Sequence, residues 1–281
     1  MSNSKLLISN LEVIENSPKL QNGKLIVAFP SIYMFDEFYS HGKILGQIIA
    51  SSHNMRPFVK VWCQDVYPDI PLQYSAPDQI DFIEINQYGI ASLPDFEQRV
   101  DTKQIPYHTQ NCHAEFLRGN ENFVLLTKPE GYAPCLFLRD YSELYLKIAK
   151  EIGVTEVYTV GTRLAEVSPR GKATGYATSE EAIQILEKNS VTIMKNEAAP
   201  YFTNVILGVA SEHYEMTGFR INSNHGEKPP YEDSIRKMLE TLSKISGIGY
   251  DKHVFDWVMN DWISSLKLGG SDIESDDRFR N

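Results

Sequence analysis

Residues 25–31 read Leu-Ile-Val-Ala-Phe-Pro-Ser, and this stretch decides the fold. Five apolar residues in a row are typical of a β-strand that is buried on both faces, as the strands of a parallel sheet are. Pro30 removes a backbone donor and ends the run. In residues 35–51, apolar side chains such as Leu45 and Ile48 recur at helical spacing, with charged residues between them. The stretch therefore predicts a strand, a turn and an amphipathic helix that packs on the strand.

The same alternation continues along the chain. Apolar runs of strand length alternate with amphipathic segments of helical length, which predicts an α/β fold with a mostly parallel sheet covered by helices on both faces. Residues 178–181, Thr-Ser-Glu-Glu, supply a capping side chain and two acids that interact favourably with a helix dipole. The further strands expected are 58–62, 81–85, 123–127, 154–161 and 204–210, and the further helices are 141–152, one from 178, 230–246 and 251–268.

One continuous domain is the simplest organisation for these segments. We expect an N-terminal segment at residues 1–21, an α/β core domain at 22–250, and a C-terminal helix with an acidic tail at 251–281. Within the core, residues 91–120 are polar and lack periodicity, so the sequence predicts an irregular insertion there. Three prolines between residues 66 and 77 predict a long loop.

Charge and cysteine content exclude several classes of function. The formal net charge is -10 and the pI is about 5.2, whereas nucleic-acid binding needs a clustered excess of Lys and Arg. The three cysteines have no CxxC spacing and indicate neither a disulfide framework nor a zinc ribbon. No basic start precedes an apolar run, and no apolar stretch approaches the roughly 18–20 residues that span a bilayer. We expect a cytoplasmic protein that binds neither nucleic acid nor membrane.

Motifs of several enzyme classes are absent. The chain contains no G-x-x-x-x-G-K-[ST] loop, no G-x-G-x-x-G after a strand, no G-x-S-x-G elbow and no H-E-x-x-H helix. His108, Cys112 and His113 suggest a metal site or a thiolate–imidazolium pair. They offer no convincing fourth ligand, however, and their segment has the polarity of a solvated loop. We therefore predict no catalytic residue, no metal and no cofactor.

Small or polar residues follow three of the expected strands. They are Pro30, Ser31, Gly161, Thr162, Arg163 and Glu212. In an open parallel sheet, ligands bind outside the carboxyl ends of the strands, so these residues can line one cleft for a nucleoside- or phosphate-like ligand. Gly, Ser and Thr also make tight turns after strands without any ligand. Both interpretations stay open.

An enzyme or a small-molecule binding protein is the alternative function at this cleft. A nucleoside-type transfer or hydrolysis requires four side chains to converge, namely Ser31, Thr162, Arg163 and Glu212. Arg163 would then supply charge to an anionic ligand, and Glu212 would hold a sugar hydroxyl or act as a base. A binding module would use the same residues without turnover.

The last expected helix is rich in aromatic residues. It carries Phe255, Trp257 and Trp262. Aromatic side chains occupy both buried helix faces and the centres of subunit interfaces. A terminal helix normally docks on its own domain. Core packing is therefore the favoured interpretation, and a docking face for another subunit is the alternative.

Four features follow one another in an order that resembles a known family. They are the strand and helix at 25–50, Val-Tyr-Thr-Val-Gly-Thr at 157–162, Pro-Arg-Gly-Lys-Ala-Thr-Gly-Tyr-Ala-Thr at 169–178, and Ile-Ser-Gly-Ile-Gly-Tyr-Asp at 245–251. Together they resemble the proteasome assembly chaperone family in its archaeal and bacterial form, some relatives of which are described as ATP-grasp-like. The resemblance implies a fold similar to that of purine nucleoside phosphorylases. It also implies homo-oligomers, trimers or larger, that present C-terminal segments to proteasome α-subunits.

The chain departs from the family pattern in two places. Pro30 is followed by Ser31 instead of the glycine that is frequent there, which makes a phosphate-like pocket less open. The C-terminal residues Phe279, Arg280 and Asn281 lack the hydrophobic–Tyr–any tripeptide of proteasome activators. We predict a non-catalytic assembly chaperone-like or scaffolding protein, with proteasome α-subunits as the partner that the resemblance implies.

Overall fold

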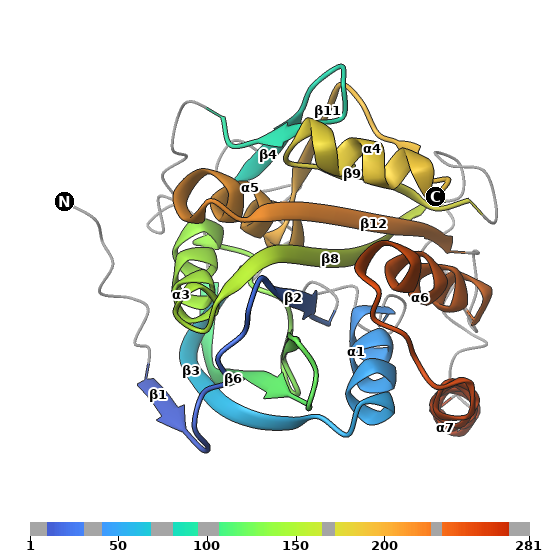
Figure 1. The fold of residues 1–281 in the computed structure, drawn as a ribbon. Coiled ribbons are helices and arrows are strands. Elements are labelled where there is room, and N and C mark those ends of the chain that lie inside the picture. The colour runs from blue at the N-terminus through green and yellow to red at the C-terminus, as the bar shows by residue number, and fades with distance from the viewer. Residues whose placement is uncertain are drawn as a thin grey trace.

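A nine-stranded sheet forms the centre of the molecule (Figure 1). The computed structural model describes residues 10–30, 41–68, 81–94, 107–164, 172–225 and 232–269. In spatial order the strands are β1 (Asn10–Val13), β3 (Arg56–Pro68), β6 (Tyr107–Arg118), β7 (Phe123–Thr127), β2 (Gly23–Ala28), β8 (Val154–Leu164), β12 (Thr217–His225), β9 (Thr174–Ala177) and β10 (Thr192–Ile193).

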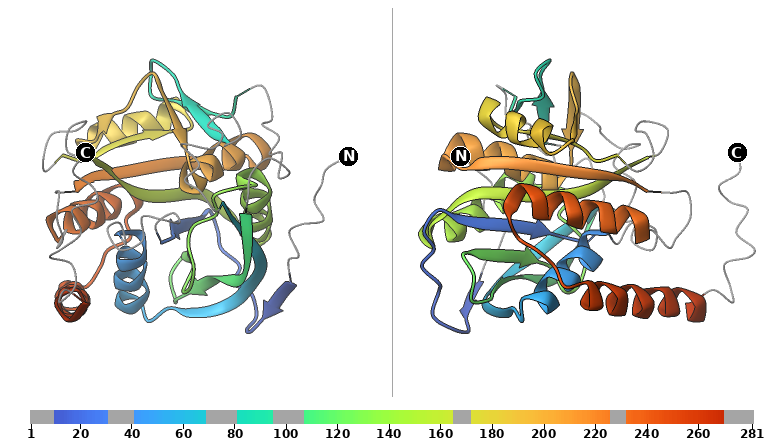
Figure 2. Two further views of the ribbon diagram at one scale, coloured as in Figure 1. Left: turned by 180° about the vertical axis from the view of Figure 1, so that it is seen from behind. Right: turned by 45° about the vertical axis from the view of Figure 1, so that its right-hand side comes forward.

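Helices cover both faces of this sheet (Figures 1 and 2). One face carries α3 (Leu138–Glu151) and α5 (Phe202–Tyr214). The opposite face carries α1 (His41–Ser52), α4 (Glu180–Lys188), α6 (Glu232–Ser246) and α7 (Lys252–Gly269). A second sheet of three strands packs on α5, and its strands are β11 (Glu197–Pro200), β4 (Phe82–Ile85) and β5 (Ala91–Ser92).

The centre of the large sheet is parallel, and the side chains of β2 show the burial on both faces that such a strand requires. β7, β2, β8 and β12 run in the same direction, whereas β1, β3 and β6 add an antiparallel flank, and β9 is antiparallel to β12. In β2, Leu25 and Val27 pack towards α3 and α5, while Ile26 and Ala28 pack towards α1. All four side chains are fully buried, as a central parallel strand requires. The α/β prediction with helices on both faces is confirmed.

The segment predicted as an irregular insertion, residues 91–120, contains one of the longest strands. β6 pairs with β3 along its whole length, so the prediction is wrong for this part of the segment. Cys112, Ala114 and Phe116 are buried at every second position, which is the period of a half-buried strand. The polar residues between them obscure that period. Residues 95–106 lie outside the described residues.

The sequence predicts a strand at residues 204–210, but the structure has a helix there. The segment belongs to α5, in which Val205, Leu207 and Val209 are fully buried. This helix lies between the large sheet and the three-stranded sheet, and it therefore lacks the polar stripe of a surface helix. A continuous apolar run is equally typical of a buried strand, which is why its pattern indicates the wrong element.

Gly153 ends α3 and leaves no room for a side chain. Its φ is +91°, and a Cβ added to it would lie 2.3 Å from the backbone oxygen of Leu20. The amide of Leu20 in turn donates a hydrogen bond of 2.8 Å to the oxygen of Ile152, which fixes this backbone. Both the left-handed conformation and the close approach therefore require glycine.

Gly153→Ala is expected to lower the free energy of unfolding by roughly 2–4 kcal/mol, because left-handed strain and the backbone overlap add. Gly247 is the matched control, because its φ is +75° while no described heavy atom lies within 4 Å of an added Cβ. Gly247→Ala should cost only about 1 kcal/mol of strain. Urea unfolding followed by circular dichroism measures both losses. Equal losses would show that the contact with Leu20 relaxes without cost.

Candidate functional site

The carboxyl ends of β2, β8 and β12 meet at one edge of the sheet because these strands are parallel. The register joins Val27 to Thr159, so Pro30 after β2 comes level with Thr162 in β8. Pro30 itself is buried. Ser31, the next predicted residue, lies outside the described residues. This edge is the part of the predicted cleft that the structure describes.

The end of β8 contains three predicted cleft residues in succession. Gly161, Thr162 and Arg163 pair with residues 222–224 of β12. Their backbone is therefore extended and held between two strands, and it does not form the tight turn that the alternative interpretation expects there.

Glu212 lies at the opposite end of the strands. It belongs to the last turn of α5, and the following strand, β12, begins with Thr217 opposite Glu156 of β8. Thr162 comes six positions after Glu156 in β8, which corresponds to roughly 20 Å of strand. The Glu212 carboxylate accepts a hydrogen bond of 2.6 Å from the amide of Leu93 instead. The enzyme alternative requires four side chains to converge, and Glu212 lies too far away to be one of them.

A buried polar cluster lies in the middle of β8 and β12, on the face of the sheet that α5 covers. Thr159 of β8 pairs with Arg220 of β12, and Arg220 pairs with Tyr176 of β9. Two residues further along β12, Asn222 pairs with Thr174. Side chains at this spacing share one face of a sheet. We call this group the Arg220 cluster, and its members are Thr159, Thr174, Tyr176, Arg220, Asn222 and, from α5, Asn204.

Arg220 is only 7% exposed, and neutral groups hold its guanidinium. Nε donates to Oδ1 of Asn222 and Nη1 donates to the oxygen of Val160, both at 2.8 Å. A Cβ on Gly161 would lie 1.8 Å from Nη2, so the missing side chain makes room for the guanidinium. Burial lowers the pKa of Arg220, and the phenol of Tyr176 opposes this shift. This gives Gly161 a packing role that its sequence position alone does not reveal.

The other members of the Arg220 cluster are also buried. The hydroxyl of Tyr176 donates to Oδ1 of Asn204 at 2.7 Å, which fixes the first turn of α5 over the cluster. Thr159 and Thr174 are 0% and 4% exposed. Among the described residues, neither hydroxyl has a hydrogen-bond partner. The cluster therefore offers unused hydrogen-bonding groups beside a positive charge.

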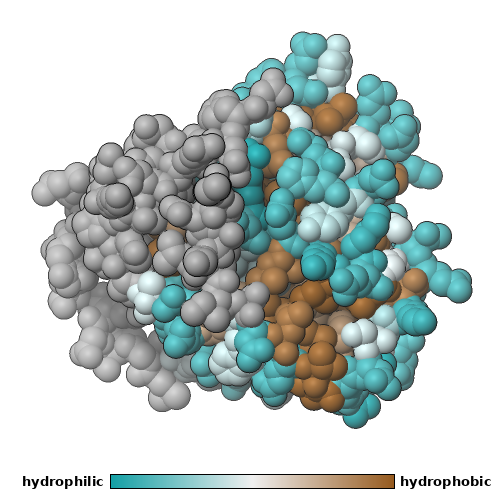
Figure 3. Space-filling view, turned by 90° about the vertical axis from the view of Figure 1, so that its left-hand side faces the viewer, coloured by the Kyte–Doolittle hydropathy of each residue, from teal (hydrophilic) through white to brown (hydrophobic). Residues whose placement is uncertain are grey.

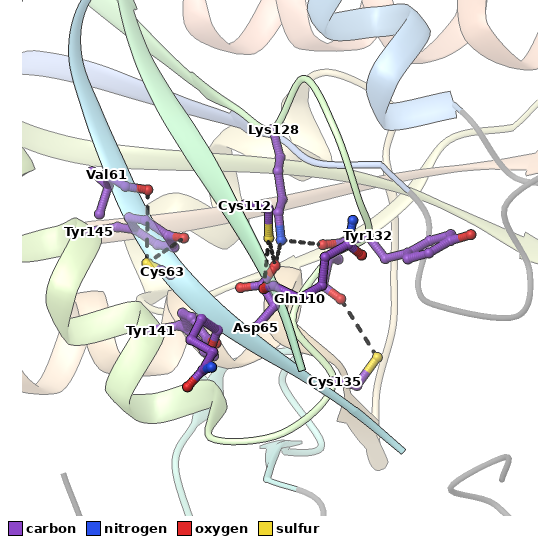
Figure 4. A network of polar contacts seen from close by, with 12 residues as sticks. Val61, Cys63, Asp65, Gln110, Cys112, Lys128, Tyr132, Cys135, Tyr141 and Tyr145 are labelled. Atoms are coloured by element: carbon purple, nitrogen blue, oxygen red, sulfur yellow. Dashed lines mark hydrogen bonds and ion pairs between the residues drawn. The ribbon is translucent and has the colours of Figure 1, made fainter. Parts of the chain in front are cut away.

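A second buried polar network joins β3, β6 and the end of β7 (Figure 4). The Lys128 ammonium and the Cys112 thiol both donate to Oδ2 of Asp65. Nζ of Lys128 also donates to the backbone oxygen of Tyr132 at 2.7 Å. The side chains of Lys128 and Asp65 are each 1% exposed, which closes the network to a substrate. We assign it the structural role of tying these strands together.

Burial dominates the protonation of this network. It lowers the pKa of Lys128 to about 7, and negative charge on Cys63 or Cys135 would oppose that shift. The direct contact with Asp65 also favours the charged ammonium. Burial likewise raises the pKa of the Cys63 thiol, which disfavours a thiolate there. Lys128 and Asp65 therefore depend on each other for compensation of a buried charge.

Cys112 and His113 point away from each other because they are neighbours in a strand. Cys112 bonds to the buried Asp65, whereas the ring of His113 lies 4.5 Å from that of Trp62, and its Nε2 is 3.2 Å from Oε1 of Glu115. These two residues therefore do not form a thiolate–imidazolium pair. Over the residues that the structure describes, no group of three His, Cys, Asp or Glu side chains is placed to hold a metal ion.

The edge strand β1 carries exposed apolar side chains. Leu11, Val13 and Ile14 are 50%, 67% and 44% exposed. The neighbouring Trp62 is 37% exposed, and its Nε1 donates to the carboxylate of Glu12 at 2.9 Å. Figure 3 views the side of the molecule on which β1 lies and shows hydrophobic surface gathered in its lower part. We call Leu11, Val13 and Ile14 the β1 surface.

The aromatic residues of α7 divide between the core and the surface. Phe255 is fully buried in the core cluster that includes α1 and α6, and Arg236 of α6 lies 4.2 Å from the centre of its ring. Trp262 is half-buried, and Trp257 is 59% exposed. Core packing is thus right for Phe255, while Trp257 is available for another contact. None of the helices in the described part of the chain has the length and apolar character needed to cross a bilayer.

Comparison with known proteins identifies the fold. No family model and no curated protein matches the chain. Among solved structures, it is similar to Pyrococcus furiosus PbaA, an archaeal homolog of proteasome-assembly chaperone, with a TM-score of 0.61 and 14% identity over 93% of this chain and 96% of that one. Pyrococcus furiosus PbaB, an archaeal proteasome activator, gives a TM-score of 0.59 and 14% identity over 93% and 98%.

A bacterial structure extends the comparison. A Mycobacterium tuberculosis proteasome-assembly chaperone homologue gives a TM-score of 0.53 and 12% identity over 88% of this chain and 96% of that one. The similarity in each case covers 88% or more of both chains. The chain therefore has the fold of archaeal and mycobacterial homologues of proteasome-assembly chaperones.

Proposed function

We propose that the chain is a cytoplasmic assembly chaperone-like or scaffolding protein that forms homo-oligomers of three or more subunits and binds proteasome α-subunits. The observation that carries this proposal is the end-to-end similarity to PbaA, over 93% of this chain and 96% of that one. An archaeal proteasome-assembly chaperone homolog and an archaeal proteasome activator both have this fold.

Two surface features support a role in assembly. β1 occupies the end of the large sheet, so an edge strand and the apolar β1 surface lie together. Exposed edges of this kind pair readily with other chains, and exposed apolar patches mark protein contacts. The second feature is Trp257 on α7, an aromatic side chain that is 59% exposed. We assign the β1 surface to contact between copies of this chain.

Affinity purification of the tagged full-length chain from its own cells should recover proteasome α-subunits, identified by mass spectrometry. A variant without residues 270–281 should recover the same subunits, because the β1 surface and Trp257 lie outside the deleted segment. Light scattering on the purified protein should give a mass of at least three 32.0 kDa chains. Leu11→Glu combined with Val13→Glu should lower that mass. Recovery of no α-subunit by the full-length chain would count against the proposal.

A further inference from the structure

The guanidinium of Arg220 is a buried positive charge without a described counter-ion. Burying an isolated charge is expensive, and a buried arginine is normally compensated by a carboxylate or a phosphate. Its recorded partners, Asn222 and the Val160 carbonyl, are both neutral. The charge of Glu197 acts on the same region, because it adds to the effect of burial in raising the pKa of Tyr176.

Arg220 also has donors to spare. A guanidinium carries five N–H groups, and two of them are used here, on Nε and on Nη1. The remaining donors include both on Nη2, which lies over Gly161. Gly161 is itself half-exposed, whereas Arg220 is only 7% exposed. An anion that reaches this position would meet the unused donors of the guanidinium.

Two hydroxyls stand on either side of this charge. Thr159 and Thr174 come from β8 and β9, on the two sides of β12, and neither hydroxyl has a described partner although both are buried. An unpaired buried hydroxyl costs free energy, so a ligand that accepts these hydrogen bonds recovers that cost. The first turn of α5 is held over the cluster by Tyr176 and Asn204, and helix N-termini favour negative charge.

We propose that the Arg220 cluster binds the phosphate group of a small molecule. The guanidinium and two hydroxyls, from three neighbouring strands, supply more donors than the two oxygens of a carboxylate need, whereas a phosphate has a further oxygen to accept them. Arg220 neutralises the charge, Thr159 and Thr174 donate hydrogen bonds, and Gly161 provides the space. The site does not depend on the assembly role, and a protein with no proteasome partner would still bind phosphate there.

Isothermal titration of the purified full-length chain with inorganic phosphate, at fixed ionic strength, tests the proposal. Wild type should bind phosphate, and acetate should bind at least about tenfold more weakly. Arg220→Gln should abolish binding, because charge-assisted hydrogen bonds contribute most of the affinity. Arg118→Gln is the matched control, since Arg118 pairs with Glu15 at 2.8 Å elsewhere, and it should bind as wild type does.

A double variant, Thr159→Val with Thr174→Val, tests the site in a protein that should remain folded. These hydroxyls make no described hydrogen bond, so the double variant should keep the wild-type melting temperature. It should bind phosphate at least about tenfold more weakly, because it lacks two hydrogen-bond donors to the ligand. A tenfold loss corresponds to about 1.4 kcal/mol of binding free energy. No binding of phosphate by wild type, or equal affinity in wild type, Arg220→Gln and the double variant, would overturn the proposal.

Discussion

Lys128→Met is expected to lower the free energy of unfolding by about 3–5 kcal/mol, the typical cost of removing one partner of a buried ion pair. Lys128 and Asp65 are each 1% exposed in their side chains, so water cannot replace the lost partner. The Asp65 carboxylate would keep its hydrogen bond from Cys112 but lose the ammonium that compensates its charge. The loss should also loosen β3 against β7, because this contact joins the two strands across β6.

A double-mutant comparison separates the pair from simple loss of packing. Asp65→Asn combined with Lys128→Met removes both charges and should be less destabilising than the sum of the two single changes. Lys147→Met, on the exposed face of α3, is the control and should change the free energy of unfolding by no more than about 0.5 kcal/mol. Urea unfolding at neutral pH measures all four variants. Strict additivity of the two changes would contradict the coupling.

Phe202→Ala should cost about 3–5 kcal/mol, because it removes a large, fully buried side chain and leaves a cavity. The ring of Phe202 stacks on Phe29 after β2 at a centroid distance of 4.9 Å and meets Tyr145 of α3 edge-on at 5.8 Å. Phe29 and Tyr145 also contact each other, at 5.8 Å. Three elements distant in sequence therefore share one aromatic contact that begins α5.

Two controls belong with this change. Phe202→Leu keeps most of the buried volume and should be clearly less damaging than the alanine variant. Tyr88→Ala removes an aromatic ring that is 62% exposed and should leave the free energy of unfolding within about 0.5 kcal/mol of wild type. Thermal unfolding followed by near-ultraviolet circular dichroism reports the aromatic packing directly. A similar loss for Phe202→Ala and Tyr88→Ala would mean that the aromatic contact is not part of the core.

Much of the fold can be predicted from periodicity because the parallel centre repeats one simple unit. β2 and β8 appear as apolar runs close to their observed bounds. The helix starting at residue 178 has its cap at Ser179, whose side chain accepts a hydrogen bond from the amide of Ala182. Residues 31–40, which include the predicted start of the first helix, lie outside the described residues, and α1 is described from His41.

The errors arise where tertiary packing changes the meaning of a local pattern. α5 is buried on both sides, so its side chains lack the polar stripe by which a helix is recognised. β6 carries polar residues on one face, and its pairing with β3 is a long-range contact that composition does not reveal. The two sheets on either side determine the element for α5, and the paired strand β3 determines it for β6.

The candidate site, like the fold, can be predicted from the sequence only in part. The sequence analysis places Gly161, Thr162 and Arg163 where the apolar run of the strand ends, whereas in the structure they form the last part of β8. Arg220 is missed, although it alternates with Phe219 and Ile221, which are buried on the other face. The available signal was a charged residue that stands between two apolar residues in a strand buried on both faces. Its meaning depends on register, which brings Thr159 and Tyr176 beside it.

Native mass spectrometry of the purified chain mixed with purified proteasome α-subunits tests the central claim most directly. The assembly role predicts a defined complex that contains both proteins in a fixed ratio, with the chain present as at least three copies. Arg220→Gln and the variant without residues 270–281 should form the same complex, since neither the Arg220 cluster nor the C-terminal residues are assigned to that contact. Separate species of the chain and the α-subunits at every mixing ratio would contradict the account.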